Sequence, residues 1–170
     1  MYSFGFDPGI NYCAWALVDD KFNVVLCGMI KNPAKTKVKG WDKLTEMIPE
    51  VERVLGDILE RRYAKDIHYW ICEGQYPGPG NPDHQTRNGW LSAIAYSFGK
   101  MSRERHIAIP SNWTKNQPKE MRHDVLLNQV VKNAPEDWEW YGKPCSASLM
   151  HNIYDAVGLA AWGIQNLKGV

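Results

Sequence analysis

The spacing of apolar positions changes along the chain, and each change marks a different kind of element. In the first part of the sequence, short apolar runs are separated by turn residues, a pattern that predicts three β-strands. Farther along, apolar residues recur at every third or fourth position, which is the spacing of an amphipathic helix. The predicted strands are 2–7, 12–19, 23–31, 67–72 and 107–109, and the predicted helices cover 51–59, 84–101, 118–132 and 148–167.

Three segments around these helices follow a less regular pattern. The apolar stripe of the first helix continues upstream to Trp41, and Pro49 within it either starts the main helix or kinks it. Residues 110–115 are expected to form a connector. Residues 133–146 are expected to form an acidic, tryptophan-rich loop, and we assign it no chemistry.

The predicted order βββ-α-β-α-β-α-α indicates an α/β protein with a mixed five-stranded sheet flanked by helices. The first three strands are joined by short turns and are expected to form an antiparallel meander. Strand 67–72 follows a helix, and such a crossover makes a strand parallel to an earlier one. The length of 170 residues fits a single domain, residues 1–170.

Composition narrows the class of protein further. Hydrophobic residues make up 44% of the chain, which excludes a disordered protein, and no apolar run approaches the roughly 20 residues that span a bilayer. We see no signal peptide before the first strand, so we expect a cytoplasmic protein with no membrane partner, in the host cytoplasm if a phage encodes it. Four scattered cysteines are typical of reduced core residues: Cys13, Cys27, Cys72 and Cys145.

Positive charge is concentrated in two segments, although the net charge is only +1. Residues 31–43 hold five lysines against one acid, and residues 100–122 hold six basic residues against Glu104 and Glu120. Such segments suit a local surface for a polyanion, but they also occur as ordinary solvated loops and helix faces.

Three acids lie at the ends of elements whose surroundings are apolar. Asp7 ends the first strand before a Pro-Gly turn, Glu73 follows the fourth strand, and Asp155 borders the apolar face of the last helix. A buried carboxylate is costly unless a metal or another cation compensates it. Because parallel strands end at the same edge of a sheet, we expect Asp7 and Glu73 to face each other. Carboxylate oxygens favour Mg²⁺ or Mn²⁺ over zinc, and no cluster of Cys and His has zinc spacing.

The element order together with three motifs resembles the RNase H-like (retroviral integrase) superfamily. Within it, the sequence is most similar to the RuvC-type Holliday junction resolvases, bacterial or phage-like. The motifs are Phe6-Asp-Pro-Gly9, Ile71-Cys-Glu-Gly-Gln-Tyr76 and His151-Asn-Ile-Tyr-Asp-Ala-Val-Gly-Leu-Ala160. The resemblance covers nearly the whole chain, and it implies an RNase H-like fold.

The resemblance also implies a metal site. Asp7, Glu73 and Asp155 match the metal-binding acids of that family, which hold two Mg²⁺ ions, with Mn²⁺ possible. The family has a fourth ligand, an acid or His three residues before the last Asp, where this chain has Asn152. His151 lies one residue earlier, and both side chains share the helix flank of Asp155. Of the two we favour His151.

DNA contacts follow from the same resemblance and from the basic segments. Tyr76 lies where relatives stack an aromatic ring on junction bases, and Lys119 lies roughly where they keep a basic residue near the scissile phosphate. The predicted DNA-binding residues are Gln75, Tyr76, Arg87, Lys115, Lys119 and Arg122. His68, His84, His106 and His123 are expected to be structural. The resemblance implies a homodimer, with helix 84–101 as the expected interface.

The leading functional hypothesis is a crossover junction endodeoxyribonuclease, in which Asp7, Glu73, Asp155 and Lys119 carry metal-dependent phosphodiester hydrolysis. One alternative is a junction-binding protein with little cleavage. Another keeps the fold but changes the substrate to flaps, forks or genome ends. An actin-like ATPase is disfavoured, because such enzymes need two lobes and a second phosphate loop.

Overall fold

The computed structural model describes residues 1–75 and 82–167, and its centre is one mixed five-stranded sheet. The strands are β1 (Tyr2–Asp7), β2 (Tyr12–Asp19), β3 (Val24–Lys31), β4 (Ile67–Glu73) and β5 (Glu104–Ala108). Their order in the sheet is β3-β2-β1-β4-β5. The first three strands pair antiparallel, whereas β4 and β5 run parallel to β1. The predicted fold class is therefore confirmed.

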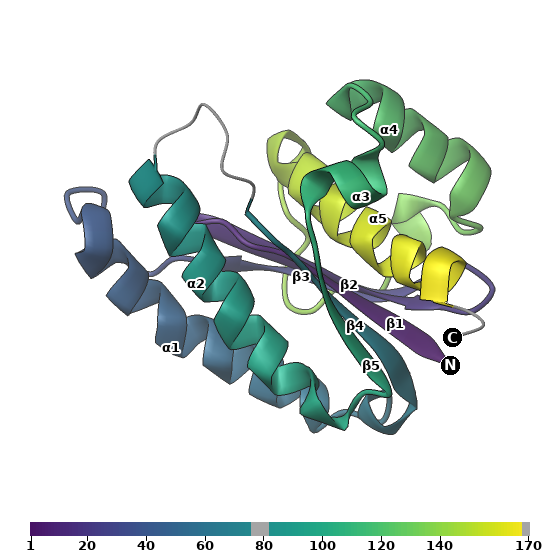
Figure 1. Cartoon of the computed structure of the whole chain (residues 1–170), viewed down its shortest axis with the longest axis horizontal. Helices are drawn as coiled ribbons and strands as arrows, with labels where there is room; N and C mark the ends of the chain where they lie inside the picture. The colour runs from purple at the N-terminus through teal and green to yellow at the C-terminus, as the bar shows by residue number, and fades with distance from the viewer. Residues whose placement is uncertain (76–81, 168–170) are drawn as a thin grey trace.

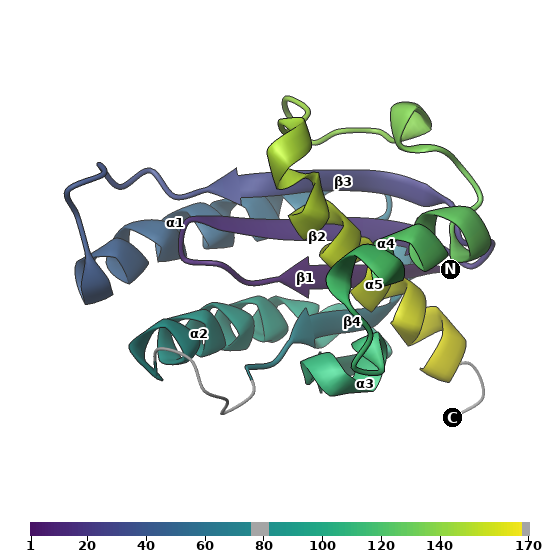
Figure 2. The same ribbon diagram turned by 90° about the horizontal axis from the view of Figure 1, so that it is seen from above.

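Helices cover both faces of this sheet and make three layers (Figure 1). One face carries α1 (Gly40–Leu59) and α2 (Pro82–Phe98). The other carries α5 (Met150–Leu167), with α3 (Pro110–Thr114) and α4 (Lys119–Val125) beyond it. Viewed from above, α5 crosses the strands diagonally (Figure 2).

The alternation of side chains along β1 explains why both faces are covered. Phe4 and Phe6 are completely buried in the core under α1 and α2. Gly5, between them, faces α5. A Cβ at Gly5 would lie 2.1 Å from the carbonyl oxygen of Ala156, so only glycine lets α5 pack this closely. This close contact holds the helix that carries Asp155 directly over the first strand.

Several element boundaries differ from the sequence prediction. The last strand covers 104–108 rather than 107–109, because β5 is an edge strand and its first three residues are polar, which hides it from an apolar pattern. The expected connector contains the short helix α3. The helix predicted over 118–132 is α-helical only as far as Val125, where α4 ends. A π-helical turn over Leu126–Val130 follows it. Pro49 lies inside one continuous helix α1 and so does not start it.

The tryptophan-rich loop closes the other edge of the sheet. The backbone amide of Cys27 on β3 donates to the Glu139 carbonyl at 3.0 Å, and the Tyr141 amide donates to the Cys27 carbonyl at 2.8 Å. The Asn133 side chain bonds both backbone groups of Val24 at 2.9 Å. Trp138 is buried among the residues under α5. The loop therefore covers the unpaired backbone groups of an edge strand.

Three of the four cysteines lie in the core. Cys13, Cys27 and Cys72 are buried and free, and Cys145 is partly buried and free. Among the described residues, no helix is both long enough and apolar enough to cross a membrane.

Candidate active site

Two of the predicted acids meet at the carboxyl end of the central strands. Phe6 on β1 pairs with Cys72 on the parallel strand β4, so the next residues, Asp7 and Glu73, emerge side by side at the same edge. A hydrogen bond joins their two carboxyl groups. The topology expected from the helical crossover thus produces the expected pair.

Burial and the repulsion between neighbouring carboxylates raise the pKa values of both carboxyl groups. Burial raises the pKa of Asp7 well above its ordinary value, and the charges of Glu73 and Asp155 raise it further. Burial also raises the pKa of Glu73, which the hydrogen bond from Asp7 partly offsets. The charge of Lys119 lowers the pKa of Asp7 and the charge of Arg122 lowers the pKa of Glu73, but neither outweighs burial and the neighbouring carboxylates. The pair is therefore short of positive charge.

The third acid, Asp155 on α5, is buried, and nitrogen-bearing side chains from α4 surround it. The Lys119 Nζ atom lies 2.6 Å from Oδ2, and the His123 Nε2 atom lies 2.9 Å from Oδ1. The Arg122 Nη1 atom lies 3.6 Å from Oδ1. Burial alone would raise the pKa of Asp155, but the hydrogen bonds from His123 and Lys119 outweigh it and lower the pKa. Asp155 is consequently held as a carboxylate.

The spacing of these three side chains along α4 explains why they converge on Asp155. Positions 119, 122 and 123 are related by three and four residues, so a single face of α4 presents all of them to α5. Sequence reasoning expected His123 to be structural and did not link Arg122 to an acid. The i, i+3, i+4 spacing inside a basic segment was the available signal, but it did not identify the partner.

All three acids line one open cavity of about 520 Å³. His151 and Asn152, the two predictions for a fourth ligand, line it as well, with His151 exposed and Asn152 partly buried. Lys119 and Arg122 line it from α4. The structure therefore brings together every predicted metal ligand, and the roles of these residues stay predictions.

The remaining predicted DNA contacts lie elsewhere. Gln75, Arg87 and Lys115 are among the described residues and do not line this cavity. Gln75 and Arg87 are partly exposed, whereas Lys115 is exposed in a left-handed turn between α3 and α4, with a φ of 51°. Tyr76 lies outside the described residues.

The chemistry of the donor set fits a hard divalent cation. Within residues 1–75 and 82–167, no three His, Cys, Asp or Glu side chains are already placed as a metal cluster. However, the carboxyl groups of Asp7 and Glu73 lie next to each other at the ends of β1 and β4, and Mg²⁺ prefers carboxylate oxygens. Asp155 would join them by exchanging Lys119 for the ion. The residues present therefore fit the ion that the resemblance implies.

Comparison with known proteins supports the fold. No protein-family profile matches the chain, and no curated protein matches it by sequence. Among solved structures, Thermus thermophilus RuvC in complex with a Holliday junction substrate matches with a TM-score of 0.68 at 15% identity, covering 99% of this chain and 96% of that one. A second Thermus thermophilus RuvC structure matches with a TM-score of 0.70 at 14% identity, covering 99% and 97%. The chain thus has the fold of RuvC over nearly its whole length, as the three motifs predicted.

Proposed function

We propose that the protein is a metal-dependent endodeoxyribonuclease that resolves four-way or other branched DNA. The observation that carries this proposal is one cleft with two electrostatic halves. A cation-poor pair, Asp7 and Glu73, lies opposite a cation-rich group centred on Asp155. Such a cleft suits a metal ion on one side and a phosphate group on the other. The likeness to a RuvC structure that contains a Holliday junction supports DNA as the substrate.

Asp7, Glu73 and Asp155 would hold two Mg²⁺ ions, with Mn²⁺ as the alternative and with His151 or Asn152 as a further ligand. Bound metal would lower the pKa of an attacking water and stabilise the leaving oxygen of the phosphodiester. Lys119 and Arg122 would donate hydrogen bonds to the phosphate oxygens and neutralise developing charge. His123 would keep Asp155 oriented and deprotonated through its 2.9 Å hydrogen bond.

The test compares parent protein with Glu73→Gln on four-way, flap, forked and linear DNA in Mg²⁺ and in Mn²⁺. The substitution removes one charge from the cation-poor pair, so we expect cleavage of the preferred branched substrate to disappear. Glu46→Gln, an exposed acid on α1, is the matched control and should cleave like the parent. Undiminished cleavage by Glu73→Gln would refute the proposal. Preference for flaps or forks over four-way DNA would select the flap-type alternative.

A junction-binding protein with little cleavage is the second hypothesis. The close contact between Lys119 and Asp155 favours it, because the lysine already satisfies one proposed metal ligand. Asn152, in place of an acid or histidine, favours it as well. Purified protein that binds four-way DNA tightly, yet never nicks it with either metal, would establish this alternative.

The proposed homodimer rests on the surface of α2. Trp90 on this helix is 55% exposed, which is unusual for a large aromatic side chain. Sedimentation of the parent and of Trp90→Ser tests the prediction. We expect a dimer that the substitution weakens, and a parent protein that stays monomeric at high concentration would contradict it.

A further inference from the structure

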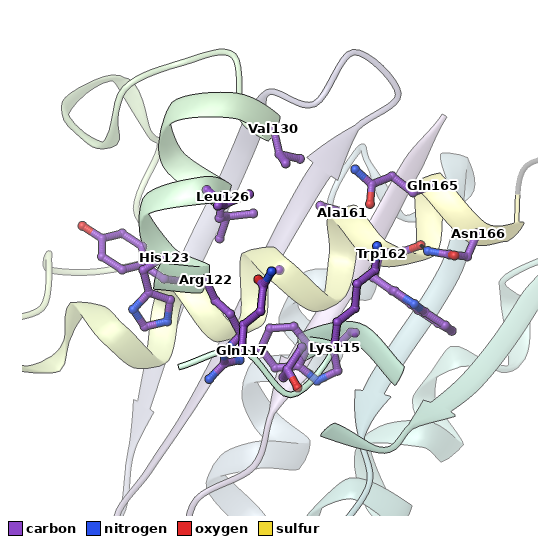
Figure 3. A pocket seen from close by; sticks show the side chains of 15 residues that line it. Lys115, Gln117, Arg122, His123, Leu126, Val130, Ala161, Trp162, Gln165 and Asn166 are labelled. Carbon is purple, nitrogen blue, oxygen red and sulfur yellow. Dashed lines mark hydrogen bonds between the residues drawn. The ribbon is translucent and has the colours of Figure 1, made fainter. Parts of the chain in front are cut away.

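A second cavity, of about 260 Å³, lies between α4 and α5, close to the acid cleft (Figure 3). Leu126 and Val130 line it from the π-helical turn that follows α4, and Ala161 lines it from α5. Gln117 and Gln165 also line it, from the turn before α4 and from α5. The cavity therefore combines apolar walls with amide groups that can both donate and accept hydrogen bonds.

The size and lining of this cavity limit the ligand that it suits. Its volume is below the roughly 300–1,000 Å³ typical of pockets for drug-sized molecules, so one small ring system is the matching size. The indoles of Trp113 and Trp162 also line it. Aromatic and apolar walls suit the faces of a flat ring, and the amides of Gln117 and Gln165 suit its polar edges. These are the properties of a nucleobase.

Arg122 connects this cavity to the acid cleft, because it lines both. Its guanidinium lies over the Trp113 ring, 4.8 Å from the centroid. Its Nε and Nη1 atoms are buried and have no hydrogen-bond partner among the described residues, although Nη1 lies 3.6 Å from Asp155. Buried donors without acceptors are uncommon, and an ordered water or the acceptor group of a ligand would satisfy them. A nucleotide offers both parts, a phosphate for Arg122 and a base for the cavity.

We propose that the cavity between α4 and α5 binds one unpaired nucleobase, next to the phosphate that occupies the acid cleft. The inference rests on the proposed nuclease function. It adds a site that would make cleavage depend on which base lies next to the cleaved phosphate. The base would come either from a DNA strand, turned out of its stack, or from a free nucleotide.

The first experiment measures binding without cleavage. ¹⁵N-labelled protein in EDTA is titrated with each of the four deoxynucleoside monophosphates, and with 2-deoxyribose 5-phosphate as a ligand that lacks the base. We expect at least one nucleotide to shift the Trp162 indole signal, which Trp162→Phe assigns, and the sugar phosphate to leave it unchanged. Equal shifts from both ligands, or none, would overturn the proposal.

Variants of the cavity give a second, independent measurement. Because base stacking contributes about 1–3 kcal/mol, Trp162→Ala should weaken binding of that nucleotide by about fivefold or more. Gln165→Ala should weaken it as well and change which base binds best. Trp41→Ala and Gln129→Ala replace exposed residues of the same types outside the cavity and should bind like the parent. Cavity variants with parental affinity would contradict the assignment.

A single-stranded hexanucleotide separates the two sources of the base. Shifts of the Trp162 signal by both the hexanucleotide and the nucleotide would assign the cavity to a DNA strand, and shifts by the nucleotide alone would assign it to free nucleotides. The outcome is independent of catalysis. Nucleotide binding by a protein that never cuts DNA would refute the nuclease and keep the base site. An active nuclease that binds no nucleotide would refute the base site alone.

Discussion

The strand-borne and helix-borne acids of the cleft have opposite electrostatic environments. Asp7 and Glu73, at the ends of β1 and β4, have raised pKa values because they are buried and close to other carboxylates. Asp155, on α5, is also buried, yet its pKa is lowered because His123 and Lys119 donate hydrogen bonds to it. All three acids are buried, so burial alone does not explain the opposite pKa shifts. The hydrogen bonds that Asp155 accepts from Lys119 and His123 explain the difference.

The difference follows from which side chains a strand end and a helix face can each place next to an acid. Parallel strands place their last residues side by side, so they concentrate like charges and leave the compensation to a ligand. A helix packed on another helix faces a row of side chains, and α4 presents Lys119, Arg122 and His123 to α5. The strand half is thus suited to an added cation, and the helix half is suited to the negative charge of a phosphate.

The largest predicted effect comes from removing charge in the strand half. Asp7→Asn should lower the rate of branched-DNA cleavage by about 1000-fold, the upper range for losing one pre-organised electrostatic group. The rate is measured in single turnover with saturating protein, so that weaker DNA binding does not enter. Asp124→Asn, an exposed acid on α4 outside the cleft, serves as the matched control. Asp7→Asn with more than a tenth of the parental rate would show that the strand half holds no essential ion.

The next prediction concerns how pH and divalent cations change the free energy of unfolding. Without such cations, the raised pKa of Asp7 means that the folded protein binds a proton that the unfolded chain has lost. The free energy of unfolding should therefore fall as the pH rises above 3.8, the ordinary value for this carboxyl group. Mg²⁺ at 100 times its dissociation constant should raise the free energy of unfolding by about 2.7 kcal/mol at pH 7.

Urea unfolding with EDTA or with Mg²⁺ measures both effects. In Asp7→Asn the loss of stability with rising pH should be smaller, and the Mg²⁺ stabilisation should largely disappear. Glu46→Gln should keep both. A parent protein that Mg²⁺ stabilises no more than Asp7→Asn would break the proposed division of the cleft into a cation-poor and a cation-rich half.

The two halves also differ in how far the sequence predicts them. Asp7 and Glu73 follow from the sequence because strand order and a helical crossover fix where parallel strands end. The contact between His123 and Asp155 joins two helices across 32 positions, and no local pattern specifies how α4 docks on α5. The same limit hid β5, because the polar residues of an edge strand carry no alternating apolar pattern. Local periodicity predicts elements, whereas contacts between distant helices depend on packing that only the folded chain shows.

A smaller effect is expected in the helix half. His123→Ala removes a hydrogen bond to a buried carboxylate, so the free energy of unfolding at pH 7 should decrease by about 1.5 kcal/mol. His106→Ala is the matched control, because His106 pairs with Glu104 at 3.4 Å on the exposed edge strand, where such pairs contribute about 0–1 kcal/mol. Urea unfolding measures the free energy of unfolding of both variants. Equal decreases would mean that the burial of Asp155 does not strengthen its hydrogen bond with His123.

The smallest effect concerns the proposed fourth metal ligand, for which Asn152 and His151 are the two candidates. Asn152 and His151 both line the cleft on the flank of α5 that carries Asp155. Sequence considerations favoured His151, but this side chain is exposed, whereas Asn152 is partly buried and lies one turn before Asp155. The partly buried Asn152 is therefore the better candidate for a metal ligand. Its amide oxygen is uncharged and would bind the ion weakly.

Asn152→Ala should therefore weaken Mg²⁺ binding only about threefold, and Asn152→Asp should strengthen it about fivefold because it adds a charged oxygen ligand. Calorimetric Mg²⁺ titrations of these variants and of His151→Ala measure the difference, and His151→Ala should bind like the parent. If His151→Ala binds Mg²⁺ more weakly than Asn152→Ala does, His151 is the fourth ligand. In that case the exposed side chain of His151, which already lines the cleft, supplies a nitrogen ligand from the N-terminal turn of α5.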